Sequence, residues 1–252
     1  MAYDLNVGAG ALPVLLRRAQ DLGWECIARV STPASTSKPT SPSPRTPGCE
    51  QQHEIRVLER VNLGCAWEQC PKYKDSHDLI GLECDASTTS EIFKKICERA
   101  ECDLITINLS KPLSFYLSQS HVQCAVRRGV AFEILYSKVL HADESTRRSI
   151  FGNARLLCRS TRGKGLVLSS GTANPLDLRS PSDAQNLATL FGLKPAEAKS
   201  AVESTCARIV ERAGLRRGFK RGFHLREKTR EDVENFDENR VAGAKKPRVQ
   251  KY

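Results

Sequence analysis

The stretch that decides the fold runs from Gly129 to Asp183 and reads GVAFEILYSKVLHADESTRRSIFGNARLLCRSTRGKGLVLSSGTANPLDLRSPSD. Its first apolar run, Val130–Tyr136, is interrupted only by Glu133, and its length and composition are those of a strand. Glu144–Thr161 follows with apolar residues at helical spacing, and Leu166–Ser170 is a second short strand. Two buried strands joined by an amphipathic helix form a βαβ unit, which predicts a parallel sheet.

The rest of the chain repeats this alternation of strands and helices. With Val130–Tyr136 and Leu166–Ser170, the chain has seven expected strands, and no eighth strand can be placed. This alternation of strands and helices predicts the α/β class. The other expected strands are Ala2–Val7, Trp24–Val30, Glu54–Leu63, Asp78–Cys84 and Leu104–Leu109. The other expected helices are Ala11–Leu22, Ser87–Ala100 with Ser87 or Thr88 as its cap, Ser120–Arg128, Ala184–Phe191, and Pro195–Ala213 with a break near Glu203–Thr205.

Two segments fall outside this pattern. Residues 31–52 are rich in Ser, Thr and Pro and almost free of apolar residues, so we expect a flexible, disordered insertion there. Residues 214–252 carry 12 Lys and Arg against 6 Asp and Glu, and we expect a basic, disordered tail. The predicted organisation is therefore one domain, residues 1–213, that holds the insertion and is followed by the tail.

Composition limits the partners and the compartment. The net charge of +10 favours a polyanionic partner, and the tail supplies +6 of it. No apolar stretch reaches the length of a membrane helix, and Met1–Val7 leads into a strand rather than a signal peptide. The ten cysteines contain no CxxC pair, so buried reduced thiols are expected rather than disulfides or a zinc site.

Six short motifs carry a resemblance to a known family. In order, these are Val130-Ala131-Phe132-Glu133, Arg147-Arg148, Gly163-Lys164-Gly165, Ser169-Ser170, Pro175-Leu176-Asp177-Leu178-Arg179, and Asn186 to Leu193. In this order and spacing they resemble the thirty-kilodalton protein subunit of eukaryotic ribonuclease P and ribonuclease MRP, a family with archaeal relatives. The resemblance is specific from about Gly129 to Cys206 and looser from Ala2 to Arg128.

The resemblance implies a fold and a role. The fold would be a distorted TIM-like (β/α) barrel of the polymerase-and-histidinol-phosphatase type. The chain would be a non-catalytic subunit that supports the catalytic RNA in removing the 5′ leader from precursor tRNA. Its implied partners are that RNA, other ribonuclease P and MRP proteins including a small αβ-sandwich subunit, and a second copy of itself. The implied location is the nucleus, in particular the nucleolus, and rRNA processing would follow from service in MRP.

Basic residues are the candidates for RNA contact, because lysine and arginine neutralise phosphates and the arginine fork donates two parallel hydrogen bonds. RNA contact, ion pairing within the chain, and contact with a partner subunit remain open for each of them. The tail candidates are interleaved with Phe219 and Phe223, which could stack on bases. The full set is Arg147, Arg148, Lys164, Arg179, Arg216, Arg217, Lys220 and Arg221.

An alternative function is a metal-dependent phosphoesterase of the same barrel class. Such enzymes need a His-x-His pair on the first strand, where this chain has Asp4-Leu5-Asn6. We therefore expect no metal site and no cofactor. Glu133 lies inside an apolar strand, where an unpaired charge would be costly. We expect it to be structural, paired with an arginine such as Arg179.

Overall fold

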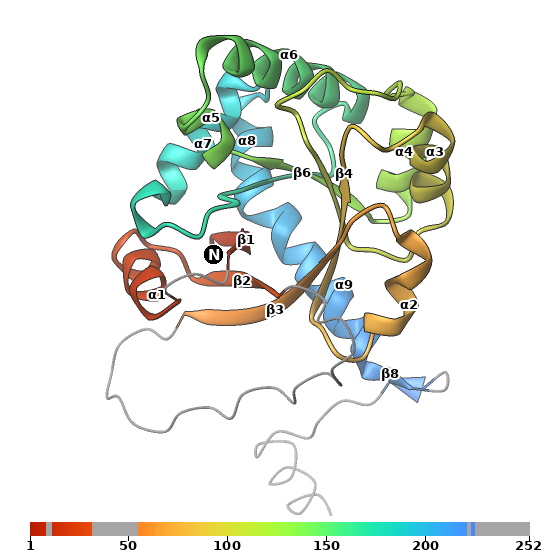
Figure 1. Cartoon of the computed structure of the whole chain (residues 1–252). Helices are drawn as coiled ribbons and strands as arrows, with labels where there is room; N and C mark the ends of the chain where they lie inside the picture. The colour runs from red at the N-terminus through yellow and green to blue at the C-terminus, as the bar shows by residue number, and fades with distance from the viewer. Residues whose placement is uncertain (9–11, 32–54, 221–222, 225–252) are drawn as a thin grey trace, which may run out of the picture. The chain divides into compact units, whose positions relative to one another are not determined.

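The computed structural model describes residues 1–8, 12–31, 55–220 and 223–224. Seven parallel strands lie in one sheet in sequence order, as the sequence predicts (Figure 1). They are β1 (Tyr3–Val7), β2 (Cys26–Ser31), β3 (Arg56–Leu63), β4 (Leu79–Cys84), β5 (Leu104–Ile107), β6 (Ala131–Leu135) and β7 (Leu166–Ser169).

The sheet curls until its two edges meet. The segment after β7 runs beside β1, where Gly171 N donates to Asn6 O at 2.8 Å and Gly8 N donates to Thr172 O at 2.8 Å. Val7 and Thr172 form a parallel bridge. Because this short pairing stands where an eighth strand would close a regular barrel, the ring is nearly closed and distorted. The predicted TIM-like barrel is confirmed.

Helices cover the outside of the ring. α6 has the predicted bounds, because Asp143 caps its first turn by accepting from Ser145 N and Thr146 N. Other termini differ from prediction: Thr89, not Ser87 or Thr88, caps α3, and α7, capped by Ser180, begins at Pro181, three residues before the expected Ala184. The longer helices are α1 (Leu12–Asp21), α3 (Ser90–Arg99), α4 (Gln119–Arg127), α6 (Glu144–Thr161), α7 (Pro181–Leu190), α8 (Pro195–Val202) and α9 (Ser204–Gly218). The sequence did not predict the short turns η1 (Trp67–Gln69), α2 (Cys70–Tyr73), α5 (Ser137–Leu140) and η2 (Pro175–Asp177).

Of these helices α9 is the exception, because it packs against the interior of the barrel; it crosses behind the strands in Figure 1. The helical conformation is interrupted at Glu203, where φ is −115° and ψ is −86°, which confirms the predicted break. Cys206, Ile209 and Val210 of α9 then join an inner apolar cluster with inward-facing residues of the strands. That cluster fills the amino end of the barrel. Its strand members are Tyr3, Leu5, Cys26, Ala28, Leu58, Leu79, Leu104, Ala131 and Val167.

The predicted boundary at residue 213 falls inside α9, which continues to Gly218. Residues Met1–Arg217 form one compact unit, and β8 (Phe219–Lys220) pairs with β9 (Phe223–His224) in the next. Ser31 belongs to β2; the rest of the predicted insertion, and the tail beyond β9, lie outside the described residues. Every described cysteine is a free thiol, which confirms the prediction for these positions, and most are buried. Among the described helices, none is long and apolar enough to cross a membrane.

Candidate functional site

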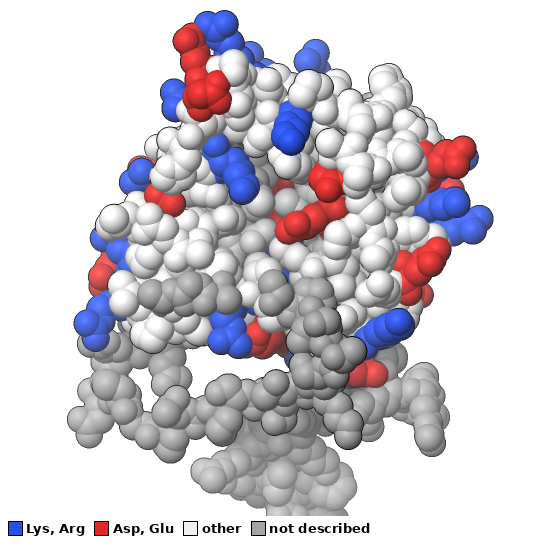
Figure 2. Space-filling model, viewed as in Figure 1, with Lys and Arg blue, Asp and Glu red and all other residues white. Residues whose placement is uncertain are grey.

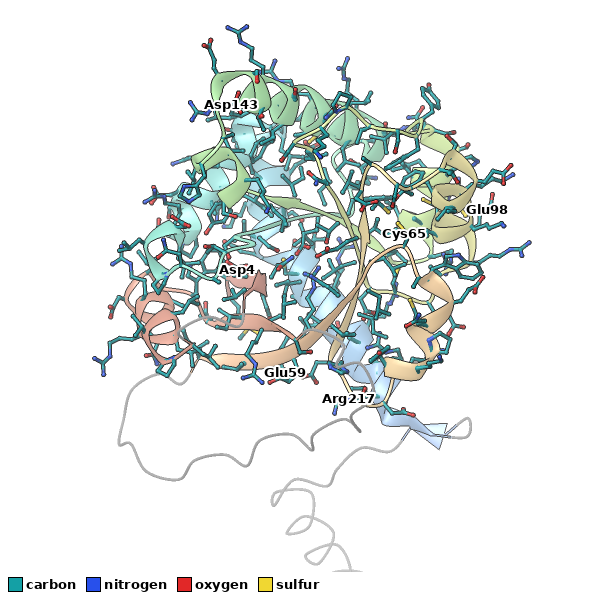
Figure 3. All side chains as sticks on the ribbon, viewed as in Figure 1. Asp4, Glu59, Cys65, Glu98, Asp143 and Arg217 are labelled. Atoms are coloured by element: carbon teal, nitrogen blue, oxygen red, sulfur yellow. The ribbon has the colours of Figure 1, made fainter. Side chains whose placement is uncertain are left out.

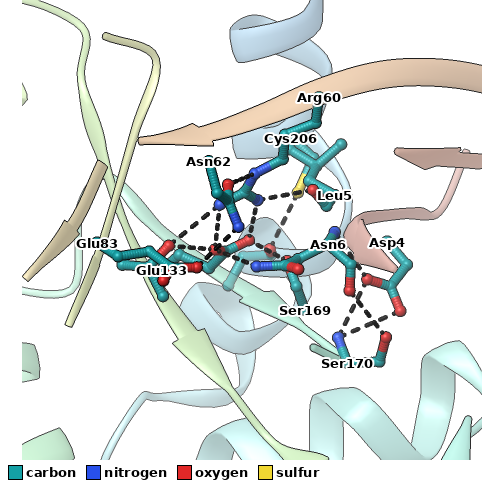
Figure 4. Close-up of polar contacts among 12 residues, drawn as sticks. Asp4, Leu5, Asn6, Arg60, Asn62, Glu83, Glu133, Ser169, Ser170 and Cys206 are labelled. Atoms are coloured by element: carbon teal, nitrogen blue, oxygen red, sulfur yellow. Dashed lines mark hydrogen bonds and ion pairs between the residues drawn. The ribbon is translucent and has the colours of Figure 1, made fainter. Parts of the chain in front are cut away.

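The middle of the barrel holds a buried ion pair instead of apolar side chains (Figure 4). Glu133 on β6 and Arg60 on β3 both have side chains fully excluded from solvent. Arg60 Nη1 donates to Glu133 Oε1 at 2.6 Å, and Arg60 Nη2 donates to Oε2 at 2.7 Å. Paired donors in this fork arrangement give the strongest geometry available to an arginine and a carboxylate.

Three further strands complete the shell of donors around Glu133. Thr106 Oγ1 of β5 donates at 2.6 Å, Ser169 Oγ of β7 at 2.7 Å, and Asn6 Nδ2 of β1 at 2.9 Å. Arg60 also donates to Leu5 O at 2.7 Å. Every oxygen of the buried carboxylate is therefore bonded, which is the condition for holding a charge away from water.

Strand alternation directs most of these side chains inward; on β1, where the register shifts between Asp4 and Val7, Leu5 and the adjacent Asn6 both face the interior. On β3, Leu58, Arg60 and Asn62 share the inner face because successive side chains point to opposite sides. β4 contributes only Gly81 at this level: a Cβ there would lie 2.7 Å from Arg60 Nη2 and 2.6 Å from Asn62 Oδ1. The glycine leaves the room that the guanidinium occupies.

The ionisation of Glu133 follows from its surroundings. Burial disfavours its charged form, but the charge of Arg60 and the hydrogen bonds from Arg60, Thr106 and Asn6 outweigh burial and lower its pKa. The carboxylate is charged at neutral pH and fully engaged. It therefore braces the strands and has no lone pair free to accept a proton from a substrate.

The predicted partner of Glu133 was wrong in one respect. Glu133 does pair with an arginine, but that arginine is Arg60 and not Arg179. The Arg179 side chain is exposed, and its backbone does the bonding: its N–H donates to Tyr136 Oη at 3.1 Å, and its carbonyl accepts from Trp24 Nε1 at 2.9 Å. Arg60 could have been found in the sequence as a charge at an inward-facing position of a strand.

Asp4 is the second buried carboxylate of the interior. Ser170 N donates to its Oδ1 at 3.0 Å, and Asn6 N donates to the same oxygen at 3.2 Å. Burial raises the pKa of Asp4 to about 6 despite these bonds. Asp4 thus ties β1 to the segment after β7 at the closure of the ring. Among the described residues, no group of three or more His, Cys, Asp or Glu side chains is placed to hold a metal ion.

A hollow of about 420 Å³ opens at the carboxyl ends of the strands. Its charged lining residues are Glu83, Asp85 and Lys138, so carboxylates outnumber cations there. Asn62 Nδ2 donates to Glu83 Oε1 at 2.8 Å. Figure 2 shows acidic atoms near the middle of one face of the molecule, with basic atoms spread around them. Barrel enzymes place their active sites at this end, but here the groups beneath it are the closed Arg60–Glu133 pair.

The predicted RNA contacts on the barrel do not form one group. Arg147 and Arg148 lie at the start of α6, at the carboxyl end, and Lys164 follows its last turn at the amino end. The 18 residues of α6 separate the two ends by about 27 Å. Arg148 pairs with Glu144, and Arg147 Nη2 donates to Ala142 O at 2.9 Å. Arg147, Arg148, Lys164 and Arg179 are all exposed.

Two of the four basic residues that the sequence predicted as RNA contacts beyond residue 213, Arg216 and Arg217, form ion pairs with the barrel. Arg216 pairs with the buried Asp103 and donates through Nη2 to Asp78 O at 2.9 Å. Arg217 pairs with Asp78. Figure 3 shows Arg217 at the end of α9, far from Asp143 at the start of α6. Because these carboxylates hold them, Arg216 and Arg217 fasten α9 to the strands. Lys220 is described only as part of β8, and Arg221 lies outside the described residues.

These features place the chain in the class of TIM-like barrels, with seven strands, α9 packed against the interior and a buried ion pair between β3 and β6. The chain belongs to the RNase P subunit p30 family, whose model matches residues 1–218. This confirms the family resemblance.

Three relatives, two of them named as ribonuclease P subunits, share between 34% and 36% of their aligned residues with this chain. The chain is 35% identical over 226 residues to ribonuclease P protein subunit p30 of Mus musculus, covering 82% of this chain and 83% of that protein. It is 36% identical over 172 residues to a probable ribonuclease P protein subunit 3 of Schizosaccharomyces pombe, covering 66% and 71%. It is 34% identical over 177 residues to the Arabidopsis thaliana protein GAMETOPHYTE DEFECTIVE 1, covering 70% of this chain but only 30% of that protein.

Two solved structures share the fold. A chain in the cryo-EM structure of archaeal ribonuclease P with mature tRNA matches with a TM-score of 0.67 at 15% identity, over 90% of this chain and 99% of that one. A histidinol phosphate phosphatase of Lactococcus lactis, complexed with zinc, matches with a TM-score of 0.50 at 10% identity, over 77% of this chain and 94% of that one.

Proposed function

We propose that this chain is a protein subunit of ribonuclease P that carries no catalytic groups of its own and supports the RNA in removing the 5′ leader from precursor tRNA. The observation that carries the proposal, beside membership of the family, is the Arg60–Glu133 pair. It occupies the interior of a barrel whose related enzymes work at the carboxyl ends of the strands. A guanidinium at this position repels a cation, and its carboxylate partner is already saturated with donors.

The alternative, a metal-dependent phosphoesterase, is less well supported by the donor set. β1 offers Asp4 and Asn6, and both are committed: Asp4 accepts from Ser170 N, and Asn6 donates to Glu133. Amide oxygen is a weak ligand for transition metals, and one carboxylate cannot hold two ions. The shared fold with histidinol phosphate phosphatase therefore reflects architecture and not chemistry.

The finer assignments belong to the same proposal. Service in ribonuclease MRP and hence in rRNA processing, location in the nucleus and nucleolus, a small αβ-sandwich partner and self-association are supported by family membership alone. Arg147, Arg148, Lys164 and Arg179 remain candidate RNA contacts because they are exposed. For Arg216 and Arg217 we propose a bracing role instead, since Asp103 and Asp78 hold them.

Reconstitution tests the proposal. The chain alone should cleave neither a precursor tRNA nor a phosphomonoester, in the presence or absence of divalent metal. Adding it to ribonuclease P RNA and the remaining protein subunits should raise cleavage of precursor tRNA. Hydrolysis by the chain alone that disappears with Asp4→Asn would favour the phosphoesterase, and full particle activity without the chain would refute the subunit role.

A further inference from the structure

A second hollow lies at the opposite end of the barrel from the acidic one. It has a volume of about 630 Å³ and opens beside the loop between α6 and β7. Arg162 and Lys164 of that loop line it, together with Ser200 of α8 and Arg208 of α9. We call this hollow the amino-end cleft, because Gly129 and Val130, just before β6, also line it.

The amino-end cleft is strongly basic. Its charged lining residues are Arg162, Lys164, Arg208 and Arg212 against the single carboxylate of Glu197. Arg212 is already held, because it donates to Arg128 O at 2.9 Å and to Cys102 O at 2.8 Å. Arg162, Lys164 and Arg208 are exposed, and none of these three forms an ion pair with any residue that the structure describes. Among the described residues, these three cations of the cleft therefore have no counter-charge; Arg208 Nη2 donates only to the Thr205 hydroxyl, at 3.5 Å.

The backbone of Arg162 adopts an unfavourable left-handed conformation. The residue ends α6 at φ 55° and ψ 37°, and it is the one non-glycine residue at positive φ among those described. This left-handed conformation suits glycine, which follows at Gly163, and is unfavourable for a residue with a Cβ. Strained backbone is commonly found where the side chain serves a function. A long cationic side chain is thus kept at a position where glycine would be more stable.

The charged residues that line the two hollows are mainly acidic at the carboxyl end and mainly basic at the amino end. This difference in charge favours a polyanionic ligand at the amino end. At the carboxyl end Glu83 and Asp85 would repel a phosphodiester chain, whereas at the amino end three free cations would attract it. Ser200 and Thr205 add hydroxyl groups to the lining of the cleft. A concave surface lined by several cations can neutralise successive phosphates of one strand, as in other RNA-binding grooves.

We propose that the amino-end cleft binds the phosphodiester backbone of RNA, with Arg162, Lys164 and Arg208 as phosphate contacts. This rests on the proposed function, because it assumes that the chain works in a ribonucleoprotein, and it names the face that meets the RNA. The polyanion would enter at the end of the barrel opposite to the one where enzymes of this architecture bind substrates.

The test compares two triple variants of the full chain by fluorescence anisotropy with a fluorescein-labelled RNA hairpin, over a range of salt concentrations. The cleft variant carries Arg162→Gln, Lys164→Gln and Arg208→Gln. The control carries Lys94→Gln, Lys95→Gln and Arg99→Gln, three exposed cations of α3 outside the cleft. Both lose the same charge. The cleft variant should bind more weakly, with the magnitude of its log-affinity versus log-salt slope reduced by about 2 to 3, at 0.7 to 0.9 per lost contact; the control should change much less.

Arg162→Gly separates binding from folding. It should raise the melting temperature, because glycine relieves the left-handed backbone, and lower the affinity for the hairpin. Equal slopes for the two triple variants would overturn the inference, as would a wild-type chain that does not bind the hairpin at low salt. Crosslinks from the cleft in the assembled particle that go to protein and not to RNA would also overturn it. In each case the proposed function stands or falls separately, by the activity of the reconstituted particle.

Discussion

Arg60 and Glu133 face each other across the interior of the barrel, joined by two hydrogen bonds of 2.6 Å and 2.7 Å with both side chains at 0% exposure. They come from strands three places apart in the sheet, β3 and β6. A pair at this position links opposite sides of the ring, which hydrogen bonds between neighbouring strands cannot do. It explains how a barrel with only seven strands keeps a fixed cross-section.

Glu133→Gln should destabilise the protein strongly, because Arg60 would stay buried without a counter-charge. Loss of one partner of a buried pair costs about 3–5 kcal/mol. Arg179→Ala is the matched control: this side chain is exposed, and its replacement should change the free energy of unfolding by less than about 0.5 kcal/mol. Chemical denaturation measures both. Equal losses in the two variants would return Arg179 to the role that the sequence suggested for it.

Gly81→Ala should disturb the same pair from the neighbouring strand. Its Cβ would lie 2.7 Å from Arg60 Nη2, so the guanidinium would have to move away from Glu133. Overpacking of this kind costs about 1–3 kcal/mol. Gly64→Ala, where an added Cβ meets nothing within 4 Å, is the control and should be nearly neutral. A tolerated Gly81→Ala would mean that the interior has more room than the contacts indicate.

The pKa of Asp4 gives stability a specific pH dependence. Burial raises this pKa from 3.8 to about 6, so the folded protein holds the proton more tightly than the unfolded chain does. The contribution of Asp4 is therefore fully present below about pH 3.8 and is lost as the pH rises through about 6. Glu133 has the opposite sign: its lowered pKa gives stability that is lost as the pH falls through its folded value.

The variant Asp4→Asn isolates this effect because it cannot ionise. The free energy of unfolding of the variant, minus that of the wild type, should rise by roughly 2 kcal/mol between pH 4 and pH 7. Denaturant titrations at several pH values measure this difference, and other carboxylates cancel in it. A difference that stays constant with pH would show that Asp4 titrates normally in the folded protein.

Arg216→Ala should loosen α9. The side chain pairs with Asp103, which is 1% exposed, and would leave that carboxylate without its main partner. Ile80 N would still donate to Asp103 Oδ2 at 2.9 Å, so the expected cost is that of one lost hydrogen bond to a charged group, about 1.5–3 kcal/mol. Arg208→Ala, on the same helix but exposed, should have a much smaller effect on stability. If Arg216→Ala leaves the melting temperature unchanged and weakens RNA binding, Arg216 is an RNA contact and not a brace.

Local pattern was enough for most of the architecture. Alternating apolar runs identified all seven strands, helical spacing identified α6 to the residue, and the break at Glu203 was visible as an interruption of a helical pattern. Capping residues were less certain, since Ser87, Thr88 and Thr89 are adjacent and chemically alike. In the structure Thr88 is used in a turn with Asp85, which leaves the cap to Thr89.

The side-chain contacts inside the barrel could not be predicted from local sequence pattern. The sequence by itself determined that Glu133 sits in an apolar strand and needs a cationic partner, because an isolated buried charge is too costly. Only the tertiary structure decided that the partner is Arg60, 73 residues away, because strand tilt and closure of the ring set which inward positions meet. For the same reason local pattern could not predict that Arg162, Lys164 and Arg208 would line one cleft, or that Arg216 would reach Asp103. The sequence shows which residues are charged. Whether a charged side chain forms an ion pair inside the barrel or stays exposed to a partner depends on the residues that folding places next to it.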